Sequence, residues 1–136
     1  MGGKVFPRLK ELWCNGNYHI GEVGWLSIMK GLEEGGCPEM QLLNFSECEW
    51  TTTVAEAFTH VLSSGHCHGL QELYLYSSFE DDESIRLVLQ SLKNVSFPSM
   101  RKFDLDDFQS NQDYSIMLGE VLAAGNSNCL GIQGAT

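Results

Sequence analysis

The chain has 136 residues, the size of one ordinary domain and enough to bury a sizeable core. Hydrophobic residues make up 43% of it and charged residues 19%, a composition that excludes a disordered polypeptide. Eight basic residues stand against eighteen acidic ones, a formal net charge of −10. The basic residues are scattered, so nucleic acids and anionic membranes are disfavoured as partners, and a protein or peptide with a basic surface is a better match.

The apolar runs and the cysteines indicate the cellular compartment of the protein. No apolar run approaches the roughly 20 residues of a membrane span, and the opening MGGKVFPRLK lacks the features of a secretory signal. Five cysteines, an odd number, in a chain without such a signal favour free thiols in a reducing compartment. We therefore expect a cytoplasmic protein.

A repeat runs through the chain from its first strand onward. FPRLKELWC, CPEMQLLNF, CHGLQELYL and FPSMRKFDL align with periods of 31, 30 and 30 residues, and a fifth copy opens near Cys129. The copies start at Phe6, Cys37, Cys67 and Phe97. Each copy places apolar residues where the first has Phe6, Leu9, Leu12 and Cys14. The alternation at its end predicts a short strand with one inward face and one outward face.

After each strand and a polar break, an apolar spacing of four residues predicts a helix of about three turns. The positions are Ile20, Gly24, Ile28 and Leu32; Trp50, Val54, Phe58 and Leu62; Ser84, Val88 and Leu92; and Tyr114, Leu118 and Leu122. Gly35, Gly65 and Gly125 follow as helix stops. Thr51 to Thr53 and the acidic residues before Ser84 are N-terminal capping candidates.

A strand and a helix in every copy predict a solenoid, because one unit cannot bury its apolar face alone. The pattern L-x-x-L-x-L followed by a helix, clearest in PRLKELWCNGNYHIGEVGWLSIMKGL, resembles leucine-rich repeats of the ribonuclease-inhibitor-like class. The resemblance implies one α/β domain over residues 1–136: a horseshoe of about four repeats, parallel strands on its concave side and helices on its convex side. The loop asparagine of that class stands at Asn17, but Cys48, Ser78 and Phe108 replace it in later copies.

The stretch GHCHG, residues 65–69, raises the question of a metal site. Cys67 occupies a repeat position that holds phenylalanine in two other copies, so we interpret it as an apolar core position. His66 and His68 lack a second ligand pair at zinc-site spacing. The weaker alternative is a metal ligand, and we expect no metal and no cofactor.

Two further motifs have a structural and a functional interpretation. The run EDDES, Glu80 to Ser84, lacks the alternating ligands and central glycine of a calcium loop, so capping of the next helix is favoured. Cys14 with His19 is a weak candidate for a nucleophile and base. Neither motif predicts catalysis, and we expect a protein that is not an enzyme.

The outward strand residues form columns across the copies, and large aromatic residues stand out among them. Trp13, Tyr74 and Tyr76 are typical anchors of protein interfaces, although aromatic residues also favour strands for packing reasons. Asn44 shares their columns, and acidic residues border them; these acids are Glu11, Glu72, Asp104 and Asp106. Such a strip suits a partner that presents lysine or arginine.

The predicted function is therefore a non-catalytic scaffold that binds a protein or peptide on its concave face. The alternatives are a regulator of an enzyme, either GTPase-activating or ribonuclease-inhibitor-like, and a fragment of a larger sensor or ubiquitin-ligase receptor. None of the three arginines is distinguished as a catalytic one. Solenoid ends normally carry polar caps, and none is obvious here, which is compatible with end-to-end self-association.

Overall fold

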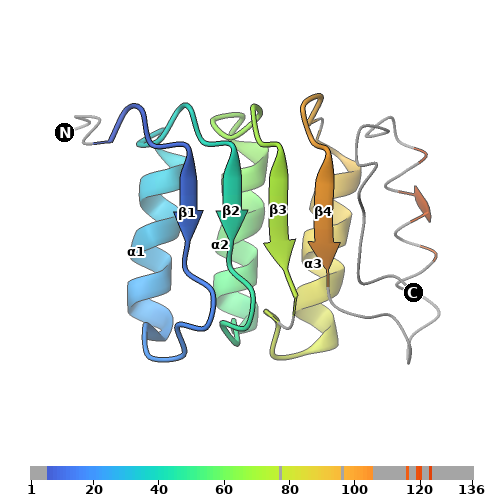
Figure 1. The fold of residues 1–136 in the computed structure, drawn as a ribbon. Helices are drawn as coiled ribbons and strands as arrows, with labels where there is room; N and C mark the ends of the chain where they lie inside the picture. The colour runs from blue at the N-terminus through green and yellow to red at the C-terminus, as the bar shows by residue number, and fades with distance from the viewer. Residues whose placement is uncertain are drawn as a thin grey trace.

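A computed structural model describes residues 6–76, 78–95 and 97–105, together with residues 116, 119, 120 and 123. Strands and helices alternate along the chain (Figure 1). The elements are β1 (Glu11–Trp13), α1 (Gly21–Glu33), β2 (Leu42–Asn44), α2 (Thr52–Ser63), β3 (Glu72–Leu75), α3 (Asp82–Lys93) and β4 (Lys102–Leu105). The expected copies at Tyr114 and Cys129 lie outside the described residues.

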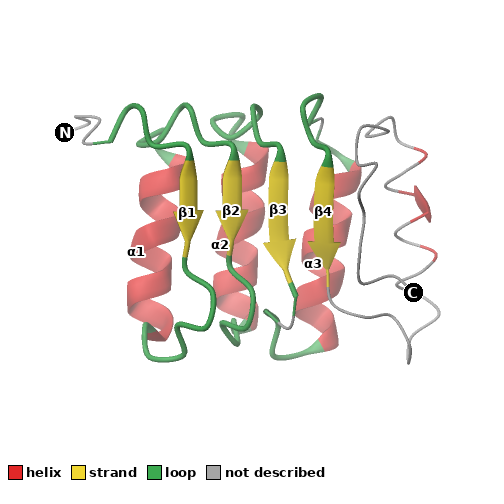
Figure 2. Ribbon diagram, viewed as in Figure 1, coloured by secondary structure: helices red, strands yellow, loops and turns green. Residues whose placement is uncertain are grey.

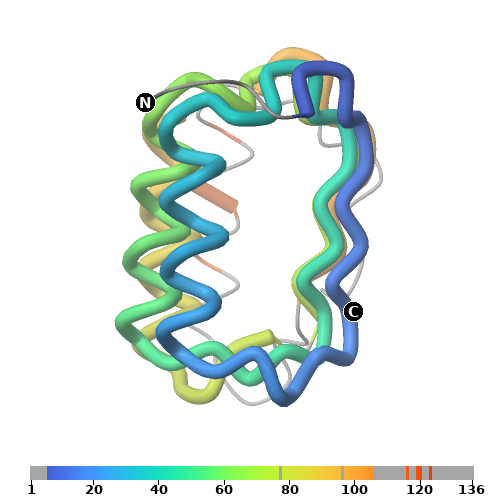
Figure 3. The backbone as a smooth tube through the Cα atoms, turned by 90° about the vertical axis from the view of Figure 1, so that its left-hand side faces the viewer, coloured from blue at the N-terminus to red at the C-terminus, as the bar shows by residue number. Residues whose placement is uncertain are grey.

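The four strands form one parallel sheet in the order β1-β2-β3-β4. Each helix connects one strand to the next, as parallel pairing requires. Figure 2 shows the strands side by side in front of the helices, and Figure 3, turned by 90°, shows two layers, with the helices on one face of the sheet. The mixed α/β class expected from the sequence is confirmed.

Residues that the sequence alignment equates lie opposite one another in the sheet. Leu12 pairs with Leu43, Leu43 with Leu73, and Leu73 with Phe103. These side chains point toward the helices, and all except that of Leu12 are buried. The strand alternation inferred from the sequence is confirmed for β3, where the burial of successive residues alternates.

The helix faces also follow the predicted spacing, but α1 differs. All four predicted positions of the second copy, among them Trp50 and Phe58, are buried, as are the three of the third copy. On α1, Ile20 and Ile28 are only partly buried, and Trp25 and Met29 supply the buried face instead. The predicted face of α1 is therefore only partly correct, because no unit in the described part of the chain lies on its outer side.

Phe6 is a second correction on the same side of the molecule. The repeat alignment makes it an inward core residue, yet 61% of its side chain is exposed. Its counterparts Cys67 and Phe97 are buried, and Cys37 is partly buried. Each of these has a strand–helix unit before it in the chain, whereas Phe6 has none in the described part.

The loops after the strands are held by a ladder of side-chain donors. Asn17 Nδ2 donates to the backbone oxygen of Cys14 at 2.8 Å, as does Cys48 Sγ at 3.2 Å from the next copy. Ser78 Oγ donates to the Phe45 oxygen at 2.7 Å. Cys48 and Ser78, which replace the loop asparagine, therefore keep a hydrogen-bond donor at this position. Phe108, at the fourth such position, lies outside the described residues.

The predicted helix caps are present. Thr51 Oγ1 accepts a hydrogen bond from the backbone N–H of Val54 at 3.4 Å, and Asp81 Oδ1 accepts one from that of Ser84 at 2.9 Å. Gly35 and Gly65 follow α1 and α2 with φ of +82°, a left-handed conformation that glycine adopts without steric cost. Gly125, the third predicted stop, lies outside the described residues.

Replacing Asp81 with alanine is expected to lower the free energy of unfolding by about 1 kcal/mol at neutral pH. The Ser84 side chain and backbone donate to Asp81 and lower the pKa of its carboxyl group. A lowered folded-state pKa means that this contribution is full above the unfolded-state pKa and is lost as pH falls through the folded-state value. Urea unfolding at neutral and acidic pH measures it. Asp81→Asn, which retains a capping oxygen, should lose much less, and equal losses for both variants would contradict the capping role.

Candidate functional site

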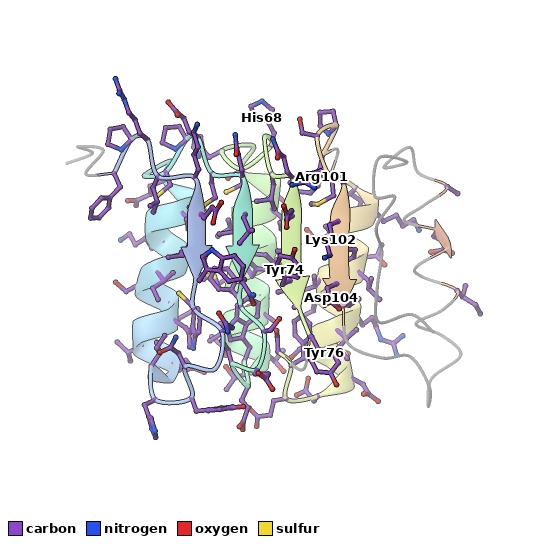
Figure 4. All side chains as sticks on the ribbon, viewed as in Figure 1. His68, Tyr74, Tyr76, Arg101, Lys102 and Asp104 are labelled. Atoms are coloured by element: carbon purple, nitrogen blue, oxygen red, sulfur yellow. The ribbon has the colours of Figure 1, made fainter. Side chains whose placement is uncertain are left out.

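The face of the sheet opposite the helices, here called the open face, carries the residues predicted to bind a partner. The sheet register places Glu11, Leu42, Glu72 and Lys102 in one row across it. It places Trp13, Asn44, Tyr74 and Asp104 in the next row. Figure 4 views this face directly, with Tyr74 near its centre and Tyr76 beyond the end of β3.

Two aromatic rings meet above β2. Trp13 on β1 and Tyr74 on β3 stack with their centroids 6.2 Å apart and their planes 22° from parallel. Strands two apart in a sheet are separated by roughly 9.5 Å, so both rings lean inward over the strand between them. Asn44 occupies that strand between the rings, and its short side chain leaves room for the stack.

The polar ends of both rings are held by glutamates on their own strands. Trp13 Nε1 donates to Glu11 Oε1 at 3.0 Å, and the Tyr74 hydroxyl donates to Glu72. Desolvation, followed by this bond to Glu72, raises the pKa of Tyr74 to about 12. Tyr74 therefore stays neutral and remains a hydrogen-bond donor at physiological pH. These bonds fix the two rings before any partner arrives, which limits the entropy lost on binding.

Two basic residues at β4 complete the face. Lys102 Nζ lies 5.4 Å from the centroid of the Tyr74 ring, within cation–π range. Arg101 forms an ion pair with Glu72 at 2.5 Å, while its own side chain remains 64% exposed. The side chains of Trp13, Tyr74 and Lys102 thus form a line of contacts across the two rows, with Glu11 at one end and the Arg101–Glu72 pair beside it.

The remaining predicted binding residues are only partly gathered here. Tyr76, with 46% of its side chain exposed, lies beyond the end of β3 and makes no ring contact with Tyr74. Asn44 is half-buried, and its Oδ1 accepts a hydrogen bond from the Ser46 backbone at 3.0 Å. Asp104 lies opposite Tyr74 in the register. Asp106 lies outside the described residues.

Leu42 is a correction to the outward columns. The sequence places it among surface residues, but it is only 6% exposed. Glu11 and Glu72 flank it on the neighbouring strands, and both reach back to ring residues of the same face. The open face therefore contains one buried leucine between two glutamates.

The stretch GHCHG is a joint between two units in the described structure. Cys67 is buried, and its thiol pKa is raised to about 11 by burial. His66 Nδ1 lies 2.8 Å from the Glu33 oxygen, and His68 Nδ1 lies 3.1 Å from the Gly65 oxygen. Within the described ranges, no three histidine, cysteine, aspartate or glutamate side chains gather as metal ligands would.

The surroundings of Cys14 and of the acidic run EDDES bear on their two interpretations. Burial raises the pKa of the Cys14 thiol, which disfavours the thiolate that a nucleophile requires. In EDDES, Asp81 accepts hydrogen bonds from Ser84 and, through Oδ2, from Thr52 Oγ1 at 3.1 Å. The capping interpretation of this run is confirmed.

Arg101 and Lys102 are the site residues that the sequence analysis did not select. Lys102 occupies the repeat position that holds Glu11 on β1 and Glu72 on β3. Opposite charges at one repeat position of adjacent strands were the available signal, since such neighbours attract across a sheet. Arg101, one residue before the strand, occupies the repeat position of Lys10, Gln41 and Gln71, and its backbone N–H donates to the Gln71 oxygen at 2.9 Å. A basic residue at the position next to the Glu72 column was therefore a signal as well.

Comparison with known proteins adds no family: no family model matches the chain, and no curated protein is significantly similar to it. Among the described residues, no helix is both long and apolar enough to cross a membrane.

Proposed function

We propose that this protein is a non-catalytic recognition module that binds a protein or peptide on its open face. The observation that carries the proposal is the pre-positioned pair of Trp13 and Tyr74. Trp13 remains 56% exposed although its ring is stacked and hydrogen-bonded. A rigid, exposed aromatic pair is characteristic of interface hot spots, because its apolar area is buried at little entropic cost.

The wider architecture that we propose is a leucine-rich-repeat solenoid in which the open face is the concave side. The in-register strands, the helix layer on one side and the donor ladder at Asn17, Cys48 and Ser78 support this interpretation. In such an array the strand face is the extended binding surface. A cytoplasmic location belongs to the same proposal.

The proposed partner presents a basic side chain beside an apolar one. Lys102 over Tyr74 provides an internal example of a cation bound on a ring of this face. The outer side of Trp13 is available for a second cation, with the exposed Glu11 next to it. The formal net charge of −10 would draw a basic partner toward the molecule as a whole.

The proposed mode of action is binding alone. Burial raises the pKa of Cys48 to about 11, as it does that of Cys67, so these thiols are protonated at neutral pH. Glu11 and Glu72 hold the rings of Trp13 and Tyr74, and Lys102 lies over the Tyr74 ring. We propose no cofactor and no metal.

Affinity capture from cell extract tests the proposal. The native chain is expected to retain a protein that the variant Trp13→Ala, Tyr74→Ala, Tyr76→Ala loses by at least about tenfold, because hot-spot residues each contribute roughly 2 kcal/mol or more. The matched control is Thr59→Ala, Ser63→Ala, Gln90→Ala in the shallow groove between α2 and α3. Circular dichroism establishes that all three proteins are folded. Equal retention by the open-face variant and the native chain would reject the proposal.

A further inference from the structure

The outer edge of β1 has the features of an unfilled strand position. Lys10 and Cys14 direct backbone groups toward β2: the Lys10 oxygen accepts from Leu42 N–H at 2.9 Å, and Cys14 N–H donates to Asn44 at 2.8 Å. Backbone groups alternate in direction along a strand, so those of Glu11 and Trp13 point the other way. In the described part of the chain no strand lies there to pair with them.

The same edge exposes apolar positions that are buried in the later units. Leu9, Leu12 and Cys14 are partly buried, and Ile28 on α1 is likewise partly buried. Their counterparts Met40, Leu43, Phe45 and Phe58 are each at most 1% exposed. In those units the preceding strand and helix cover the equivalent surface. The apolar side chains at the edge of the first unit are therefore continuous with the core but remain partly exposed in the described structure.

Charge favours a second copy of this chain as the occupant. Residues 6–36 carry three basic and four acidic side chains, a formal net charge of −1. Residues 37–66 carry four acidic and no basic side chains, and residues 67–96 carry five acidic and two basic ones. Of these three units, the first is thus the one where two copies approach with the least repulsion.

The edge is also complementary to itself. A two-fold axis through Leu12 would run two β1 strands antiparallel and place Glu11 opposite Trp13 on both sides of the axis. These residues carry the outward N–H and C=O groups, so each opposition becomes a hydrogen-bonded pair, and the two Leu12 side chains meet as a close non-hydrogen-bonded pair. On the open face the same register places the Trp13 indole of one copy beside Glu11 of the other.

We propose that two copies of the chain pair through β1 in this antiparallel register, joining their sheets edge to edge. An axis perpendicular to the sheet keeps both open faces on the same side and brings the two α1 helices together behind the strands. The paired molecule would then present one continuous open face, with Trp13 and Glu11 of both copies at its seam. Covering the edge would also bury the partly exposed apolar residues Leu9, Leu12 and Cys14.

Sedimentation equilibrium of the full chain, from about 1 μM to about 1 mM, tests the proposal, since this range spans weak and strong protein association. Glu11→Pro removes an outward N–H and leaves the β1–β2 bonds intact, because edge strands tolerate proline at such positions. Glu11→Ala removes the side chain but keeps the N–H. The native chain and the alanine variant are expected to dimerise, with the proline variant about tenfold weaker or more.

Three results would overturn the proposal: a native chain that is monomeric throughout, a folded proline variant that dimerises like the native chain, or an alanine variant as weak as the proline one. Leu12→Cys gives a second measurement that does not depend on the folding of the proline variant. Two cysteines on the axis lie at disulfide distance in the proposed register, so mild oxidation should link the copies covalently. The native chain controls for the other cysteines, and equal linkage of both proteins would count against the register.

Discussion

Replacing Trp50 with alanine is expected to lower the free energy of unfolding by about 3–5 kcal/mol, the largest stability effect that we predict. The Trp50 ring lies at the centre of an aromatic cluster that joins the first three strand–helix units. Its centroid is 5.5 Å from that of Trp25, 5.3 Å from Phe45, 5.1 Å from Phe58 and 5.8 Å from Phe79. Because the side chain is 1% exposed, the alanine variant would lose these contacts and leave a cavity.

Urea unfolding followed by circular dichroism measures this loss. Trp13→Ala is the matched control, because it also removes a tryptophan but from an exposed position. Its loss should stay below about 1.5 kcal/mol, the contribution of one aromatic pair at a surface. Similar losses for the two variants would contradict the central place of Trp50 in the core.

Replacing Ser78 with alanine is expected to lower the free energy of unfolding by about 1–3 kcal/mol. The Ser78 hydroxyl is fully buried and donates to the Phe45 oxygen at 2.7 Å, so the alanine variant would leave a buried carbonyl without this donor. In the preceding loop, the thiol of Cys48 makes the equivalent contact by donating to the Cys14 oxygen.

Ser78→Cys is therefore the informative comparison for the donor ladder. A thiol of similar size keeps a weak donor, and the cysteine variant should recover part of the stability that the alanine variant loses. Thermal unfolding of both variants beside the native chain gives the ranking. If cysteine and alanine are equally destabilising, Ser78 acts through packing rather than through its donor.

Much of the fold could be predicted because the repeat fixes which residues face each other. A period of 30 or 31 residues places Leu12, Leu43, Leu73 and Phe103 at one repeat position, and the sheet pairs them in that order. Helix positions in the second and third copies followed from a spacing of four. The prediction was wrong at Phe6 and incomplete on α1, because a repeat pattern cannot reveal that a position lacks its covering neighbour.

The candidate site was predictable in its members but not in its arrangement. Alternation identified Trp13 and Tyr74 as outward residues, but their stack depends on rings leaning across β2 above the small Asn44. The sequence suggested acids free to meet a partner. In the structure Glu72 is paired with Arg101 from the neighbouring repeat position, and strand alternation does not show which side chains pair between two such positions. The partner-facing charge is therefore more mixed than composition alone indicates.

Site-specific photo-crosslinking in cell extract tests open-face recognition most directly. A benzophenone side chain is introduced at Tyr76, exposed beside the open face, or at His60, exposed on α2. Recognition by the open face predicts a discrete crosslinked protein from position 76, reduced when Trp13→Ala and Tyr74→Ala are added, and none of that protein from position 60. The same protein crosslinked from both positions, or from position 60 alone, would contradict recognition by the open face.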